Sequence, residues 1–264
     1  MGVSIIIPYH RGEHFLRDCL DSIVEARLEE YEVIIVRDVN RLNNVDEEKS
    51  ILQLLEWYKT VLPIRDFTLL DKTGVAAARN LGLSKASKEY VYFMDSDDYL
   101  IYDGLSKMLQ VASSSEVAVV YGTMCLTWFK RYTFLKTDKQ EMYKDSKDVA
   151  TDMVKRYDVS DVAEQLFREE VSVLNMLIKR SWLEESGLHF DEANEFYSDL
   201  SYVTGLLARS TSDDTWICSR SKTYAKRYHN DTIQYPSLSQ VKANNRMEQF
   251  LDAYVASKGY IRAS

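Results

Sequence analysis

The sequence predicts an α/β protein with a mostly parallel central sheet flanked by helices. Over the first 120 residues, short runs of β-branched and aromatic residues alternate with longer stretches of helical spacing. This alternation is typical of βαβ units. The strand-like runs are almost continuously apolar, as expected when helices cover both faces of a parallel sheet.

The strands and helices are expected in the following order. The runs with strand composition are Val3–Ile7, Glu32–Val36, Phe67–Leu70, Tyr90–Met94 and Val117–Tyr121. A helix is expected after the first run, because its apolar residues recur at helical spacing; they are Phe15, Leu16, Cys19, Leu20, Ile23 and Val24.

Beyond residue 121 the alternation changes. Met124–Leu135 predicts a hairpin or an irregular crossover, and residues 147–170 have the spacing of a charged helix. Val173–Ile178 predicts a strand, and Leu200–Ala208 predicts a helix. Residues 236–264 form an amphipathic stripe, for which packing on the same protein is expected and a dimer or membrane-surface contact is the alternative.

Composition excludes several classes of protein. With 264 residues, 45% of them hydrophobic and 28% charged, the chain resembles an ordinary globular protein. A net charge of −8 argues against nucleic acid as a partner. The three cysteines lack metal-ligand spacing, which indicates reduced thiols in a cytoplasmic protein. We expect no transmembrane segment or signal peptide, and leave the inner face of the membrane as an alternative location.

The apolar run Tyr90–Met94 is followed at once by Asp95, Ser96, Asp97 and Asp98. A buried strand would deliver these acids to the carboxyl edge of the sheet, where ligands bind in open α/β folds. Carboxylates so close repel one another unless a cation or hydrogen-bond donors neutralise them. We expect a divalent metal bound by Asp97, with Asp95 holding ribose or an arginine. The alternative is a turn whose acid caps the next helix.

Two further residues could complete a nucleotide site. Asp38 closes the second strand and could accept a hydrogen bond from a nucleotide base, or it could cap a turn. The small residues of Gly74–Gly82 would let a helix approach a nucleotide closely, which leaves Arg79 to bind a phosphate or orient an aspartate. The alternative for Arg79 is a surface ion pair.

Together these segments resemble the family 2 glycosyltransferases, which have the GT-A fold. The resemblance is carried by Val3–Pro8, Phe15–Ile23, Glu32–Asp38, Gly74–Gly82 and Asp95–Asp98. Val173–Arg180 and Leu188–Glu192 are similar to segments of bacterial enzymes that build capsular and other surface polysaccharides. The glycine spacing matches neither a dinucleotide fingerprint nor a phosphate-binding P-loop.

The resemblance implies inverting transfer of a sugar from a nucleotide-diphosphate donor, most often a UDP-sugar, to a glycan or lipid-linked saccharide. It implies Mn²⁺ or Mg²⁺ at the acidic cluster, donor contacts from Pro8 and Ser96, and Asp199 as general base. Chemistry agrees on the base, because a carboxylate on the acceptor side must take the hydroxyl proton. A helix-capping role is the alternative for Asp199.

A late segment, Tyr224–Thr232, resembles the aromatic and basic loop that covers the donor diphosphate in many relatives. Arg227 or Lys226 would then offset the charge of the leaving group. His229 would complete the metal shell, with a structural role as its alternative.

We therefore expect one GT-A domain over residues 1–264. Residues 1–120 would be its nucleotide-sugar half and 121–235 its acceptor half, followed by the C-terminal helix. Three positions depart from the family pattern, namely His10, Arg37 and Ser198. Arg37 stands where the family often has an aspartate, which leaves the identity of the nucleotide base open. Ser198 stands where a glutamate usually precedes the general base, which leaves open whether Glu195 shares the role of general base.

Two rival functions remain. A sugar-phosphate nucleotidyltransferase would have a glycine-rich basic loop after the first strand. This chain has Pro8–Gly12 there instead, which argues against that rival. A glycan-binding or scaffold module on the same fold, without catalysis, is the second rival, and the departures at Arg37 and Ser198 favour it.

Overall fold

A computed structural model of the chain describes residues 1–41, 45–115, 117–127, 155–157, 172–194, 196–210, 216–227 and 252. The helices are α1 (Glu13–Glu25), η1 (Val39–Arg41), α2 (Val45–Tyr58), α3 (Val75–Lys85), α4 (Gly104–Ser115), η4 (Val173–Asn175), α6 (Arg180–Ser186) and α7 (Ser198–Arg209). The strands are β1 (Val3–Tyr9), β2 (Tyr31–Asp38), β3 (Ile64–Leu69), β4 (Tyr90–Phe93), β5 (Tyr99–Leu100), β6 (Val119–Thr127), β7 (Lys155–Tyr157), β8 (Met176–Lys179) and β9 (Trp216–Arg227).

These strands form one sheet in the order β3-β2-β1-β4-β8-β6-β9-β5, with β7 paired to β9. The four strands from β3 to β4 are parallel to one another. β8 is antiparallel to both β4 and β6, whereas β6 and β9 are parallel. The parallel arrangement predicted from the sequence is confirmed for β1 to β4, and the rest of the sheet is mixed.

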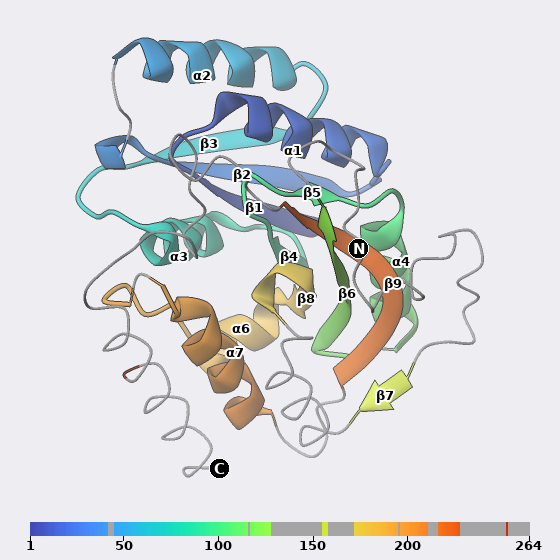
Figure 1. Ribbon diagram of the computed structural model, residues 1–264. Coiled ribbons are helices and arrows are strands. Elements are labelled where there is room, and N and C mark those ends of the chain that lie inside the picture. Colours follow the sequence, from blue (N-terminus) through green and yellow to red (C-terminus); the bar gives the residue numbers. More distant parts are fainter. Residues whose placement is uncertain are drawn as a thin grey trace.

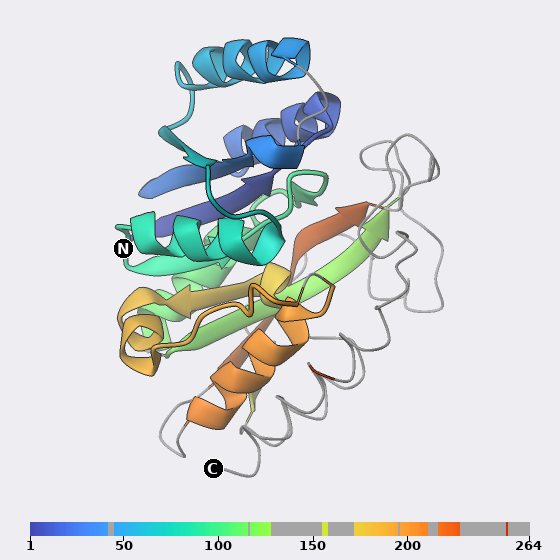
Figure 2. The same cartoon turned by 90° about the vertical axis from the view of Figure 1, so that its left-hand side faces the viewer.

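Helices cover both faces of the parallel strands. α1 and α2 lie on one face of β1, β2 and β3, and α3 lies on the other (Figure 1). Figure 2 shows α6 and α7 beside β8 and β6. All seven residues of β1 and all four of β4 are buried, so two-sided burial explains their continuous apolar sequences.

Two glycines allow the helices of the nucleotide half to begin and pack as they do. Gly12 precedes α1 in the left-handed region with φ of 86°, a conformation that favours glycine. A Cβ at Gly82 of α3 would lie 2.3 Å from Cγ2 of Ile6 in β1. A larger residue at position 82 would therefore push α3 away from the sheet.

Three segments of the second half differ from the sequence prediction. Met124 belongs to β6, which continues to Thr127 because it pairs with β9 along its length. Lys155–Tyr157 is a strand paired with β9, so the helix expected over residues 147–170 is wrong there. Val173–Asn175 is a 3-10 turn capped by Ser172, and the strand begins only at Met176. In the first two, a strand partner distant in sequence overrides local propensity, whereas in the third a local capping box favours the turn.

The expectations for one helix and for the cysteines are confirmed. The helix predicted at Leu200–Ala208 lies within α7. Cys19, Cys125 and Cys218 are free and buried. In the part of the chain that the structure describes, no helix combines the length and apolarity that a bilayer crossing needs. The predicted C-terminal helix at 236–264 lies outside the described residues, apart from Asp252.

Candidate active site

The acidic loop Asp95–Asp98 lies between the carboxyl end of β4 and the start of β5. The backbone N–H of Met94 still donates to the carbonyl of Ile6 in β1 at 3.0 Å, so the chain leaves the sheet just before Asp95. One carboxylate oxygen from each of Asp95, Asp97 and Asp98 lies within 4.8 Å of the others. The sheet thus gathers these acids at its carboxyl edge, as the strand pattern predicts.

The electrostatics of this loop favour a cation. Burial raises the pKa of Asp98 well above its ordinary value, and the neighbouring charges of Asp97 and Asp95 raise it further. Burial also raises the pKa of Asp95, although Arg79 opposes that shift. Oxygen ligands of this kind suit a hard divalent ion such as Mg²⁺ or Mn²⁺. The residues therefore fit the metal that the family resemblance implies.

The three acids are not equivalent. Asp98 is only 2% exposed. Its Oδ2 accepts from the hydroxyl of Tyr224 at 2.6 Å and its Oδ1 from the backbone N–H of Arg227 at 2.7 Å. Asp95 and Asp97 are partly exposed. Because α4 begins only at Gly104, the alternative in which the loop acid caps the next helix is wrong for Asp98.

Arg79 of α3 connects the acidic loop to α7. Its Nη2 donates to Oδ1 of Asp95 at 2.8 Å, and its Nη1 contacts Oδ1 of Asp199. The guanidinium also lies over the ring of Phe190, 5.3 Å from its centroid. Burial lowers the pKa of Arg79, but the two carboxylates outweigh it and raise the pKa, so the group stays charged. Since Arg79 is 2% exposed, the surface ion pair is excluded.

Asp199 lies in the first turn of α7, and its side chain is 38% exposed. The residue that caps this helix is Tyr197, whose backbone N–H donates to Oδ1 of Asn194 at 2.8 Å. Asp199 is therefore inside the helix rather than at the cap. Its partly exposed carboxylate contacts Nη1 of Arg79, whereas Asp95 accepts from Nη2, and its role as general base stays a prediction. Glu195 lies outside the described residues.

Pro8 and Asp38, two of the residues predicted to contact the nucleotide donor, lie near the carboxyl ends of β1 and β2. Asp38 is 3% exposed, and its Oδ2 accepts from Oγ1 of Thr73 at 2.6 Å and from the N–H of Gly74 at 2.8 Å. Asp38 thus fixes the turn that enters α3, and its contact with a nucleotide base stays a prediction. Pro8 is buried opposite Val36 in the parallel ladder. Ser96 is 8% exposed within the acidic loop.

Arg227 is the last residue of β9, and its guanidinium is engaged with the acidic loop and α1. Its Nε donates to the carbonyl of Asp97 at 2.7 Å, and its Nη1 lies 3.0 Å from Oδ2 of Asp18. The rings of Phe15 and Tyr99 lie 5.0 and 5.6 Å from it. Its contact with a donor diphosphate stays a prediction. Lys226 is exposed, and His229 lies outside the described residues.

The sequence did not single out Asp18, or Tyr224 by itself, as part of this site. Asp18 lies on α1, and the apolar spacing that predicts this helix does not indicate which of its polar residues faces the site. Tyr224 lies in β9, which pairs with β5, a strand distant in sequence. The signal that could have found Tyr224 is its place in the Tyr224–Thr232 segment.

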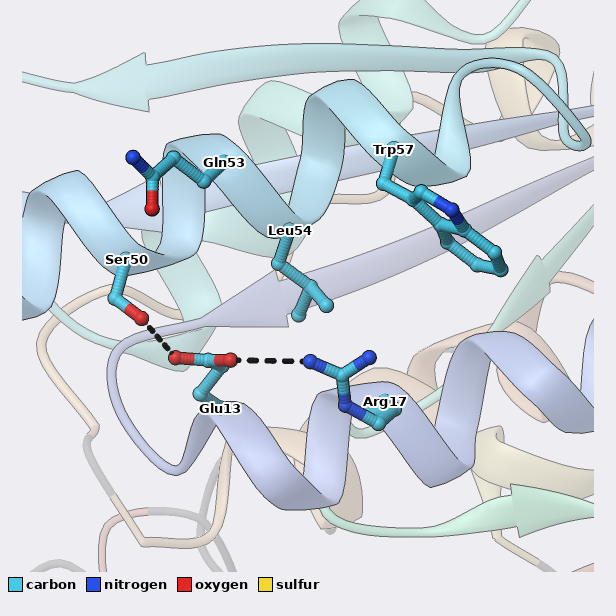
Figure 3. A pocket seen from close by; sticks show the side chains of 6 residues that line it. All are labelled: Glu13, Arg17, Ser50, Gln53, Leu54 and Trp57. Atoms are coloured by element: carbon cyan, nitrogen blue, oxygen red, sulfur yellow. Dashed lines mark hydrogen bonds and ion pairs between the residues drawn. The ribbon is translucent and has the colours of Figure 1, made fainter.

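A separate hollow of about 280 Å³ lies between α1 and α2 (Figure 3). It is lined by Glu13, Arg17, Ser50, Gln53, Leu54 and Trp57. Glu13 contacts Ser50 of α2 across it, and it also pairs with Arg17 one turn along α1. Neither the acidic loop nor Arg79 lines this hollow, so the candidate active site is the carboxyl edge of the sheet.

Comparison with known proteins shows the family of this chain. Residues 4–168 match the family model described as glycosyl transferase family 2. The poly(ribitol-phosphate) beta-glucosyltransferase of Bacillus spizizenii is 31% identical over 127 residues, which are 47% of this chain and 19% of that protein. The glycosyltransferase GlyA of Streptococcus pneumoniae is 31% identical over 120 residues, covering 44% of this chain and 16% of that protein. The chain therefore spans less than a fifth of the length of either relative.

Among solved structures, residues 1–349 of S. aureus TarS in complex with UDP-GlcNAc superpose with a TM-score of 0.73 at 18% identity. The superposition covers 97% of this chain and 66% of that chain. The UDP complex of the same protein gives 0.72 at 17% identity, covering 99% and 65%. This likeness establishes the GT-A fold, and the matched family model establishes that the chain belongs to glycosyl transferase family 2.

Proposed function

We propose that this protein is a metal-dependent inverting glycosyltransferase. It moves a sugar from a UDP-sugar to a saccharide or lipid-linked saccharide in the synthesis of a bacterial surface polymer. The observation that carries the proposal is the joint contact of Arg79 with Asp95 and Asp199. One buried guanidinium thereby contacts both Asp95, which we assign to the donor, and Asp199, which we assign to the acceptor.

The donor would bind along the carboxyl edge of the parallel strands. Asp38 and Pro8 lie at the ends of β2 and β1, where a nucleotide base would sit. Asp97 and Asp95 would hold Mn²⁺ or Mg²⁺, which would stabilise the diphosphate leaving group. The names of the matched proteins support a nucleotide sugar, because a TarS structure was solved with UDP-GlcNAc and another with UDP.

On the acceptor side, Asp199 would act as general base. The acceptor oxygen forms a bond to the anomeric carbon as the bond from that carbon to the diphosphate oxygen breaks. The acceptor proton passes to the Asp199 carboxylate, and the configuration at the anomeric carbon inverts. Arg79 would orient this carboxylate, because its fork can bind two carboxylates at once.

Two relatives support a surface polymer as the product. One is the poly(ribitol-phosphate) beta-glucosyltransferase, and another is the teichoic acid poly(glycerol phosphate) polymerase of Staphylococcus epidermidis, 22% identical over 203 residues. The proposed location is the cytoplasm, since three free buried cysteines suit a reducing compartment. Contact with the inner membrane face is proposed for a lipid-linked acceptor.

A thermal-shift screen of nucleotide sugars with and without Mn²⁺ tests the donor, because a ligand that binds only the folded state raises its melting temperature. The expected result is a rise with UDP-sugars that depends on Mn²⁺. Release of UDP from the stabilising donor then tests catalysis. A protein that binds the donor but never releases UDP, with water or with saccharide acceptors, would be the non-catalytic glycan-binding module instead.

A further inference from the structure

Strand β9 contacts the acidic loop through Tyr224, which lies beneath it. The Tyr224 hydroxyl accepts a hydrogen bond from the backbone N–H of Asp95 at 3.0 Å and donates one to Oδ2 of Asp98 at 2.6 Å. Tyr224 is 0% exposed. A single buried hydroxyl therefore joins the first and last residues of the loop.

Arg227, three positions further along β9, contacts the same loop. Its backbone N–H donates to Oδ1 of Asp98 at 2.7 Å, and its Nε donates to the backbone carbonyl of Asp97 at 2.7 Å. The ion pair with Asp18 of α1, at 3.0 Å, holds the guanidinium in this position. Together with Tyr224, these contacts fix the loop at Asp95, Asp97 and Asp98.

These contacts divide the three acids into two kinds. Both oxygens of Asp98 accept hydrogen bonds from β9 inside the protein, whereas Asp95 and Asp97 are partly exposed at the edge of the sheet. Asp98 is 2% exposed, so a metal bound by it would have to share an oxygen that already accepts a hydrogen bond inside the protein. A metal bound by Asp95 and Asp97 would leave the contacts of β9 intact.

We propose that Asp98 is an anchor rather than a metal ligand, and that Tyr224 is a positioning residue that holds Asp95 and Asp97 in the geometry for a divalent cation. This assignment rests on the metal-dependent function proposed above. Groups behind metal ligands orient them, and their loss typically weakens metal binding about 10- to 100-fold. Removing the Tyr224 hydroxyl would leave the Asp95 N–H and Asp98 Oδ2 without this partner in the interior.

The test compares Tyr224→Phe with Tyr58→Phe. Tyr58 is the matched control because it is 1% exposed and its hydroxyl also donates to a carboxylate, Oδ1 of Asp21 at 2.5 Å, away from the acidic loop. Calorimetric titration of UDP-saturated protein with Mn²⁺ should give a Kd raised about tenfold in Tyr224→Phe and unchanged in Tyr58→Phe. An unchanged Kd in Tyr224→Phe would overturn the assignment.

Asp98→Asn serves as the second variant and covers the case in which Tyr224→Phe does not fold. Because Asp98 and Tyr224 act through one contact, the double variant should weaken Mn²⁺ binding no more than the stronger single variant. A large loss in Asp98→Asn combined with no loss in Tyr224→Phe would show that Asp98 ligates the metal directly.

Hydrogen exchange without metal separates this inference from the proposed function. The amides of Asp95 and Asp98 should exchange faster in Tyr224→Phe than in the wild type and in Tyr58→Phe. Unchanged exchange would refute the positioning role. If the wild type binds no Mn²⁺ with UDP, the metal dependence of the proposed function fails, and Tyr224 has no metal ligands to position.

Discussion

Arg79 contacts Asp199 across 120 positions of the sequence, and the same guanidinium contacts Asp95. The contact joins α3, in the nucleotide half, to α7, in the half expected to bind the acceptor. Because Arg79 is buried, it has few alternative positions. The separation of the Asp95 and Asp199 carboxylates is therefore set by one side chain.

Replacing Asp199 with Asn should abolish turnover while leaving donor binding intact. The amide keeps the shape of the side chain but cannot take a proton, and loss of a general base typically costs about 10²- to 10⁴-fold in rate. UDP release gives kcat, and calorimetry gives the affinity for the UDP-sugar. Asp103→Asn is the control, because the Asp103 side chain is 59% exposed and pairs with Lys107 of α4 at 3.2 Å. A kcat near that of the wild type would remove Asp199 from the base role.

Replacing Arg79 with Lys should lower kcat and the melting temperature together. Lysine keeps the charge but lacks the planar fork that lets one side chain bind Asp95 and Asp199 simultaneously. Breaking a buried ion pair typically costs about 3 to 5 kcal/mol, and a lysine that keeps one partner should cost less. Denaturant unfolding and UDP release measure the two effects. Arg17→Lys is the control, since the Arg17 side chain is 52% exposed and should tolerate the change.

Replacing Asp97 with Asn should remove the Mn²⁺ dependence of UDP-sugar binding. A neutral amide is a weaker ligand for a hard divalent cation than a carboxylate. Calorimetry of the UDP-sugar with and without Mn²⁺ should show a large difference for the wild type and almost none for the variant. If the variant keeps the wild-type difference, the metal is held elsewhere.

Glu32 should make the stability of the protein depend on pH in the acid range. Burial raises the pKa of this carboxyl, but hydrogen bonds from Arg65, Ser4 and Ser87 outweigh it and lower the pKa to about 2. Because the folded-state pKa is depressed, its stabilisation is complete above the unfolded pKa of about 4.3. It is lost as the pH falls from there through about 2.

Denaturant unfolding of the wild type and Glu32→Gln at pH 7, 4 and 3 measures this contribution. The wild type should be more stable at pH 7, and the difference should shrink at each lower pH. Glu89→Gln, on a glutamate for which no such hydrogen-bond network is present, should show no comparable trend. A constant difference between wild type and Glu32→Gln over this range would contradict the depressed pKa.

The fold of the nucleotide half could be predicted because its signals are local. The apolar runs of β1, β2 and β4 report burial on both faces, and the intervening helices fix parallel order. The same reasoning placed Asp38 and the acidic loop at one edge of the sheet. In the second half, β6, β7 and β9 follow pairing between distant segments, so the local pattern misjudged Lys155–Tyr157.

By itself, the sequence determined the parallel sheet, the position of Asp95–Asp98 at its carboxyl edge, and Asp199 near the start of a helix. Only the tertiary structure decided that Arg79 holds Asp95 and Asp199 together and that Tyr224 and Arg227 enclose Asp98. The physical reason is the distance along the chain. Arg79 and Asp95 are only 16 positions apart, but the contacts with Asp199 and Asp98 join residues 120 to 129 positions apart. Those contacts exist only after α7 and β9 have packed against the parallel strands.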